Sequence, residues 1–181
     1  MQHHLVQLAV GRRRTRRLLE TRTSRVLSFL DSEALIRRIG RGRTGSVDWP
    51  ALLRRWAQDA PLESRGSVRT YLEPRGLSAL LTRVGKLEQR YAITGSLAAV
   101  ALAPIAPARL ATIWVDDAAA TATALNLCPA DAAANVMLIE AADESAFEGA
   151  PQREGIWSAA PSQVAGDLLT SPGRGPREGR S

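Results

Sequence analysis

The residues best placed to do chemistry form one short stretch, Thr94-Gly95-Ser96. Apolar residues 91–93 lead into it and an alanine-rich run, 96–102, follows, which predicts a strand, a tight turn and a helix. Such a turn at the start of a helix can hold a phosphate on backbone N–H groups, or present one polar side chain. The sequence thus offers two interpretations of this turn, a binding site or a corner of the fold.

Catalysis at this turn would need carboxylates on the next strand. A nucleotidyltransferase-like site binds Mg²⁺ through two carboxylates at alternate strand positions. The predicted strand 110–115 contains none, and Asp116 and Asp117 are adjacent, so on a continuing strand they would point to opposite faces. We predict that they end the strand and cap the next helix. We expect no enzyme activity, no metal and no cofactor, with a degenerate nucleotidyltransferase-like domain as an alternative.

Other reactive side chains are few. The histidines, His3 and His4, stand at the N-terminus, far from any Ser-His-Asp arrangement. The single cysteine, Cys128, excludes a disulfide within the chain, and we interpret it as a small core residue. The longest apolar run, 91–115, is interrupted by prolines and Arg109, so we predict no membrane association and a cytoplasmic protein.

Charge divides the chain into unlike halves. Residues 1–90 hold 19 basic and 8 acidic side chains, a net of +11, whereas residues 91–181 hold 5 basic and 10 acidic side chains, a net of −5. A basic half beside an acidic half suggests a nucleic-acid-binding module joined to a different domain. A solvated arginine-rich face is the alternative.

The basic half has a recognisable order of elements. Residues 1–22 form a basic segment, either a frayed helix or disordered. In residues 23–60 we predict a helix, a hairpin around Gly40 and Gly45, and a helix capped by Asp48, which is the order found in the second half of a winged helix-turn-helix. The candidate DNA contacts are polar residues of the first helix and the hairpin: Arg22, Arg25, Ser28, Arg37, Arg38, Arg41 and Arg43.

The second half alternates strands and helices. After a predicted linker, 61–67, we place an α/β domain at 68–170 and a disordered tail at 171–181. The expected fold class is α+β, with α/β-like character: a partial winged helix followed by a domain built on one mixed sheet. The predicted strands of that domain are 68–72, 91–94, 110–115, 136–139 and 155–159. The predicted helices are 77–87, 96–102, 118–125 and 162–169.

Five segments together resemble the AbiEi-like antitoxins of type IV toxin–antitoxin systems, over roughly residues 23–174. They are Gly45-Ser-Val-Asp-Trp-Pro-Ala-Leu-Leu-Arg-Arg-Trp56, Tyr71-Leu-Glu-Pro-Arg-Gly-Leu77, Tyr91-Ala-Ile-Thr-Gly-Ser-Leu-Ala-Ala99, Ala134-Asn-Val-Met-Leu138 and Ala160-Pro-Ser-Gln-Val-Ala-Gly-Asp-Leu-Leu-Thr170.

The resemblance implies a transcriptional regulator that binds promoter DNA through a winged helix and represses its own operon. It also implies a C-terminal domain that counters a nucleotidyltransferase-like toxin without necessarily contacting it. Relative to the family the winged helix is expected to be truncated, so an antitoxin or protein-interaction domain without DNA binding is the alternative. Within the resemblance, Thr94, Gly95 and Ser96 form a signature turn, in which Gly95 relaxes the backbone and Ser96 caps the helix.

Overall fold

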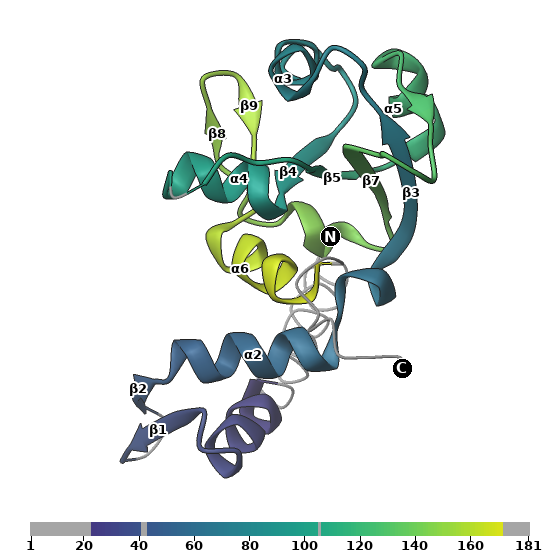
Figure 1. Ribbon diagram of the computed structural model, residues 1–181. Coiled ribbons are helices and arrows are strands. Elements are labelled where there is room, and N and C mark those ends of the chain that lie inside the picture. Colours follow the sequence, from purple (N-terminus) through teal and green to yellow (C-terminus); the bar gives the residue numbers. More distant parts are fainter. Residues whose placement is uncertain (1–22, 41–42, 105, 172–181) are drawn as a thin grey trace, which may run out of the picture. The chain divides into compact units, whose positions relative to one another are not determined.

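The computed structural model describes residues 23–40, 43–104 and 106–171, so the predicted basic segment 1–22 and most of the predicted tail lie outside the described residues. The chain divides into an N-terminal unit that ends at Leu52 and a C-terminal unit that begins at Leu53. Helix α2, Trp49–Asp59, contains this boundary. The fold is α+β with a mixed five-stranded sheet, as the sequence predicts (Figure 1).

The N-terminal unit contains a helix over residues 23–32, a two-stranded hairpin and the start of α2. Strand β1, Ile36–Ile39, pairs antiparallel with β2, Arg43–Val47. The carboxylate of Asp48 accepts a hydrogen bond of 3.0 Å from the N–H of Ala51, which is the cap predicted for α2. The predicted order of helix, hairpin and helix is confirmed.

The sheet of the C-terminal unit has the strand order β4-β5-β7-β3-β6. Strands β5 and β7 are parallel, and the other neighbours pair antiparallel. The strands are β3 (Gly66–Leu72), β4 (Tyr91–Thr94), β5 (Ala111–Val115), β6 (Cys128–Pro129) and β7 (Val136–Ala141).

Helices and a small hairpin surround this sheet. Helices α4 and α6 contact each other and strand β4, whereas α5 contacts β7; in Figure 1 α3 and α5 lie away from the α4–α6 pair. The bounds are α3 (Leu77–Val84), α4 (Gly95–Leu102), α5 (Ala118–Ala124), α6 (Pro161–Thr170), two 3₁₀ helices (Leu62–Ser64 and Glu144–Phe147), and the hairpin strands β8 (Gln152–Arg153) and β9 (Ile156–Trp157).

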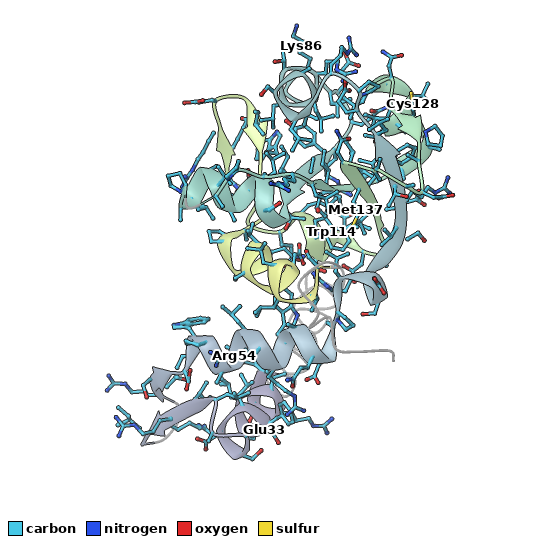
Figure 2. The ribbon with its side chains drawn as sticks, in the orientation of Figure 1. Glu33, Arg54, Lys86, Trp114, Cys128 and Met137 are labelled. Carbon is cyan, nitrogen blue, oxygen red and sulfur yellow. The ribbon has the colours of Figure 1, made fainter. Side chains whose placement is uncertain are left out.

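Strand β5 is the centre of the core, because all five of its residues are buried. Side chains alternate along a strand, so burial of every residue means that both faces of the sheet are covered here. Trp114 is fully buried, and Figure 2 shows it enclosed among the elements of this unit, with Cys128 near the outside. Every helix in the described ranges is too short or too polar to span a lipid bilayer.

The structure corrects three local predictions. Cys128 is exposed on the short edge strand β6 and is not a core residue. The predicted linker 61–67 is structured instead, since Leu62 is fully buried in a 3₁₀ helix and β3 begins at Gly66. Helix α6 begins at Pro161 and has no side-chain cap, so Ser162 does not cap it. Proline fits this first turn because its missing N–H would lack a partner there anyway.

The first prediction concerns the close contact between Gly166 of α6 and the ring of Trp56. A Cβ added at Gly166 would lie 2.7 Å from Cε3 of the Trp56 ring. We expect Gly166→Ala to lower the free energy of unfolding by about 1–2 kcal/mol, because overpacking outweighs the gain in helix propensity. The midpoint of urea unfolding measures this loss.

Gly85 provides the matched control. It lies at the end of α3 with φ of −63°, and a Cβ there would meet its nearest neighbour at 3.6 Å. We expect Gly85→Ala to leave the midpoint near that of the wild type. Equal midpoints for Gly166→Ala and the wild type would contradict the packing argument.

Candidate functional site

The β1–β2 hairpin presents arginines from both of its strands. Arg37 pairs with Ser46 and Arg38 with Thr44, so Gly45 is an extra residue that forms a bulge in β2. A Cβ at this glycine would collide with the side chain of Ile39, so only glycine leaves room for the isoleucine where it lies. The bulge therefore belongs to the geometry that presents the arginines.

The arginines of this hairpin are available to a ligand. Arg37, Arg38 and Arg43 are all exposed. No ion pair or hydrogen bond to another described residue occupies their guanidinium groups. Three arginines on one small hairpin, with no carboxylate partner in the described part of the chain, form a compact cationic surface, which suits contacts with phosphate oxygens.

Several arginines of the C-terminal unit are held by carboxylates instead. Arg65 pairs with Asp167, Arg83 with Glu73, and Arg90 with both Asp116 and Glu144. A guanidinium already held by a carboxylate is a poor phosphate ligand, because an incoming anion must displace its partner. The hairpin thus brings together three predicted DNA contacts, Arg37, Arg38 and Arg43, whose guanidinium groups have no carboxylate partner among the described residues.

The remaining predicted DNA contacts stand outside the hairpin strands. Arg25 and Ser28 are exposed on the helix 23–32. Arg22 and Arg41 lie outside the described residues.

The Thr94-Gly95-Ser96 turn uses its polar groups internally. Gly95 has a φ of +61°, a left-handed conformation that glycine adopts without strain, and its Cα approaches Thr112 so closely that a Cβ would lie 3.1 Å from the Thr112 hydroxyl. The Ser96 hydroxyl donates to the carbonyl of Leu110 at 3.1 Å. The predicted relaxation of the backbone at Gly95 is confirmed, whereas the predicted cap by Ser96 is wrong.

Thr94 points into a buried polar junction centred on Asp167. The Asp167 carboxylate is fully buried and accepts hydrogen bonds from the Thr94 hydroxyl at 2.6 Å and the Trp114 indole N–H at 2.9 Å. It also accepts from Arg65 and, at 3.4 Å, from the amide of Gln163. This carboxylate joins β4, β5, α6 and the residue before β3. Both hydroxyls of the turn therefore donate their protons to protein acceptors.

Arg65 contacts two indole rings. Its guanidinium carbon lies 5.0 Å from the ring centre of Trp56 and 5.2 Å from that of Trp114. Cation–π contact adds to the ion pair with Asp167, so Arg65 is fixed in place and is part of the core. Sequence reasoning missed this pair. The signal was Asp167 itself, an acidic residue three positions after the buried Val164 and so on the same face of α6.

The two carboxylates after β5 have structural partners. Asp117 accepts from the N–H of Ala120 at 2.8 Å and caps α5, as predicted. Asp116 pairs with Arg90. Within the described residues no group of three or more His, Cys, Asp or Glu side chains is arranged to hold a metal ion.

Comparison with known proteins adds no relative: no family model, curated protein or solved structure matches the chain.

The buried hydrogen bond from Thr94 to Asp167 should contribute to the free energy of unfolding. Thr94→Val keeps the shape of the side chain and removes the hydroxyl donor to the buried Asp167. We expect unfolding to become easier by about 1–3 kcal/mol, because a buried carboxylate loses a hydrogen bond. Thr123→Val is the control, since its exposed hydroxyl bonds only within α5. A comparable small change in both variants, measured by urea unfolding, would show that the junction does not depend on Thr94.

Proposed function

We propose that this protein is a DNA-binding transcriptional regulator of the AbiEi-like antitoxin type, which binds its own promoter through the β1–β2 hairpin and the preceding helix. The observation that supports this most strongly is the set of exposed arginines on the hairpin, Arg37, Arg38 and Arg43, which have no ion-pair partner among the described residues. In a winged helix the hairpin contacts phosphates and the helix before it approaches base edges.

The charge distribution agrees with this division. The half of the chain that contains the hairpin carries the net positive charge, and the other half is net negative. Long-range attraction would therefore bring the N-terminal unit, and not the acidic half, towards DNA. Arg25 and Ser28 on the helix are the proposed contacts that could read sequence, and the hairpin arginines are the proposed phosphate contacts.

We further propose that the protein is not an enzyme and that the C-terminal unit supplies the antitoxin activity. The internal use of Thr94, Ser96, Asp116 and Asp117 supports the first part, since the groups that a transfer reaction would need are bound to protein partners. The antitoxin role rests on the resemblance. Its target would be a nucleotidyltransferase-like toxin encoded beside this protein.

DNA binding is tested by the salt dependence of a mobility shift on the promoter fragment upstream of the gene. Each phosphate contact contributes about 0.9 to the slope of log K against log salt. We expect the combined variant Arg37→Ala, Arg38→Ala, Arg43→Ala to lower that slope by about 3 and to weaken binding at low salt. The control removes three exposed arginines of the C-terminal unit, Arg69, Arg109 and Arg153, with the same change in charge.

The control separates contact from net charge. If both triple variants weaken binding equally, the effect is one of overall charge and the hairpin is not the site. If wild-type protein does not shift the fragment even at low salt, the DNA-binding proposal fails.

The antitoxin role needs a separate experiment. Co-expression of the full chain with the neighbouring toxin should restore growth, and the triple hairpin variant should restore it equally, because the proposed antitoxin activity lies in the C-terminal unit. Failure of the wild-type chain to restore growth would remove this part of the proposal and leave DNA binding untouched.

A further inference from the structure

Ile39 is a large apolar side chain on the surface of the β1–β2 hairpin. It is the last residue of β1 and pairs across the hairpin with Arg43, and it remains 55% exposed. A Cβ at Gly45 would collide with its side chain, so the isoleucine lies over this glycine. The bulge therefore holds an apolar group in a defined place near the turn, with much of its surface in contact with water.

The neighbours of Ile39 on its face of the hairpin are arginines. Side chains alternate along a strand, so Arg37 lies on the same face as Ile39, and cross-strand partners share a face, which adds Arg43. Both arginines are exposed and have no ion-pair partner among the described residues. A ligand that covers this face must therefore offer apolar surface to Ile39 and negative charge beside it.

The minor groove of double-stranded DNA combines these two properties. It is about 6 Å wide, and a row of phosphates borders it on each side. Its walls are sugar C–H groups, and its floor at an A·T pair lacks the amino group that guanine projects into the groove. Apolar side chains, isoleucine among them, enter this groove in several classes of DNA-binding protein. The narrow turn end of a hairpin, where Ile39 lies, suits a groove of this width.

The position of the hairpin in the chain favours the same groove. Residues 33–35 connect the helix 23–32 to β1 and span about 10 Å at most. When the helix lies in the major groove, as proposed above, so short a connection places the hairpin beside the neighbouring DNA backbone. The groove on the far side of that backbone is the minor groove.

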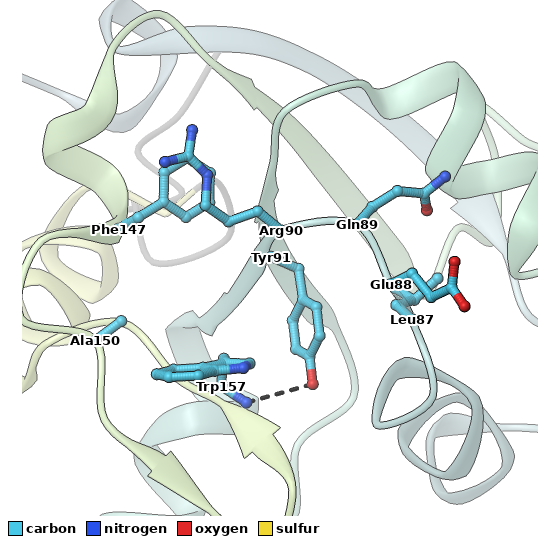
Figure 3. A pocket seen from close by; sticks show the side chains of 8 residues that line it. All are labelled: Leu87, Glu88, Gln89, Arg90, Tyr91, Phe147, Ala150 and Trp157. Carbon is cyan, nitrogen blue, oxygen red and sulfur yellow. Dashed lines mark hydrogen bonds between the residues drawn. The ribbon is translucent and has the colours of Figure 1, made fainter.

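A cavity of about 340 Å³ beside Trp157 in the C-terminal unit has no comparable charge pattern. Among the residues that line it are one carboxylate and one guanidinium, those of Glu88 and Arg90, whose charges cancel. Glu88 also points away from Trp157, on the other side of Tyr91 (Figure 3). The hairpin face, in contrast, has two like charges beside one apolar group, and this combination specifies the chemistry of the ligand.

We propose that the hairpin enters the minor groove of the promoter DNA and that Ile39 selects A·T pairs there. This inference rests on the proposed DNA binding and extends it, because the hairpin then reads sequence in addition to contacting phosphates. The amino group of guanine would occupy the space that the branched side chain of Ile39 needs, whereas an A·T pair leaves that space free. Arg37 and Arg43 contact the phosphates that border the groove.

The test uses the full chain and three versions of the promoter fragment. The A·T pairs that the protein protects from hydroxyl radicals are kept, replaced by G·C, or replaced by inosine·C. Inosine lacks the amino group of guanine, so an inosine·C pair resembles A·T in the minor groove and G·C in the major groove. In mobility shifts we expect the inosine·C fragment to bind within about twofold of the A·T fragment, and the G·C fragment about fivefold to tenfold more weakly.

The outcomes separate this inference from DNA binding itself. Binding of the inosine·C fragment as weak as that of the G·C fragment would place the selectivity in the major groove and overturn the inference. Equal binding of all three fragments would also overturn it and leave the proposed DNA binding intact. The absence of any shift by wild-type protein at low salt would remove both.

Variants assign the selectivity to Ile39. We expect Ile39→Ala to reduce the G·C penalty to about twofold and Ile39→Val to keep most of it, with the salt slope unchanged because no charge is lost. Val68→Ala is the matched control, since Val68 is a partly exposed strand residue of the C-terminal unit, and it should keep the full penalty. Urea midpoints confirm that each variant folds.

A full G·C penalty in Ile39→Ala would overturn the assignment. An anionic membrane also offers negative charge above apolar surface, so phosphatidylglycerol vesicles are the competing ligand. Loss of vesicle binding in Ile39→Ala, with its DNA selectivity unchanged, would overturn the inference in favour of a lipid surface.

Discussion

The buried carboxylate of Asp167 is the point on which the C-terminal unit depends. A charge taken out of water costs several kcal/mol unless it is paired and hydrogen-bonded. The Asp167 carboxylate accepts hydrogen bonds from the Thr94 hydroxyl and the Trp114 indole N–H. It also accepts them from the Gln163 amide and the Arg65 guanidinium. These donors come from different elements, so the arrangement that satisfies the charge also fixes the elements relative to one another.

This junction decides how the glycine turn is interpreted. Thr94 is committed to Asp167, Ser96 to the carbonyl of Leu110, and Gly95 permits a close approach to Thr112. The turn resembles a phosphate-binding turn in sequence, but its polar groups and its glycine serve the packing of the C-terminal unit. The groups that remain exposed and unpaired among the described residues include the hairpin arginines Arg37, Arg38 and Arg43. DNA binding is accordingly proposed at the hairpin and not at the most prominent sequence motif.

Much of this fold could be predicted because its signals are local. Apolar runs mark β4, β5 and β7, and Gly40 directly follows β1 at the hairpin turn. The two-residue strands β6 and β8 could not be found, because a pair such as Cys128–Pro129 has no periodicity of its own and becomes a strand only by pairing with β3. Strand β9 does fall within the strand predicted at 155–159. The Asp167 junction was missed for a related reason. Arg65 and Asp167 are 102 residues apart in the chain.

The central claim is that the protein meets DNA through the β1–β2 hairpin and that the Thr94-Gly95-Ser96 turn is structural. Hydrogen–deuterium exchange of the full chain, with and without the promoter fragment, tests both parts at once. We predict slower exchange on DNA for peptides covering 36–47 and unchanged exchange for peptides covering 91–102. Protection at 91–102, with exchange in the hairpin unaltered, would contradict the account.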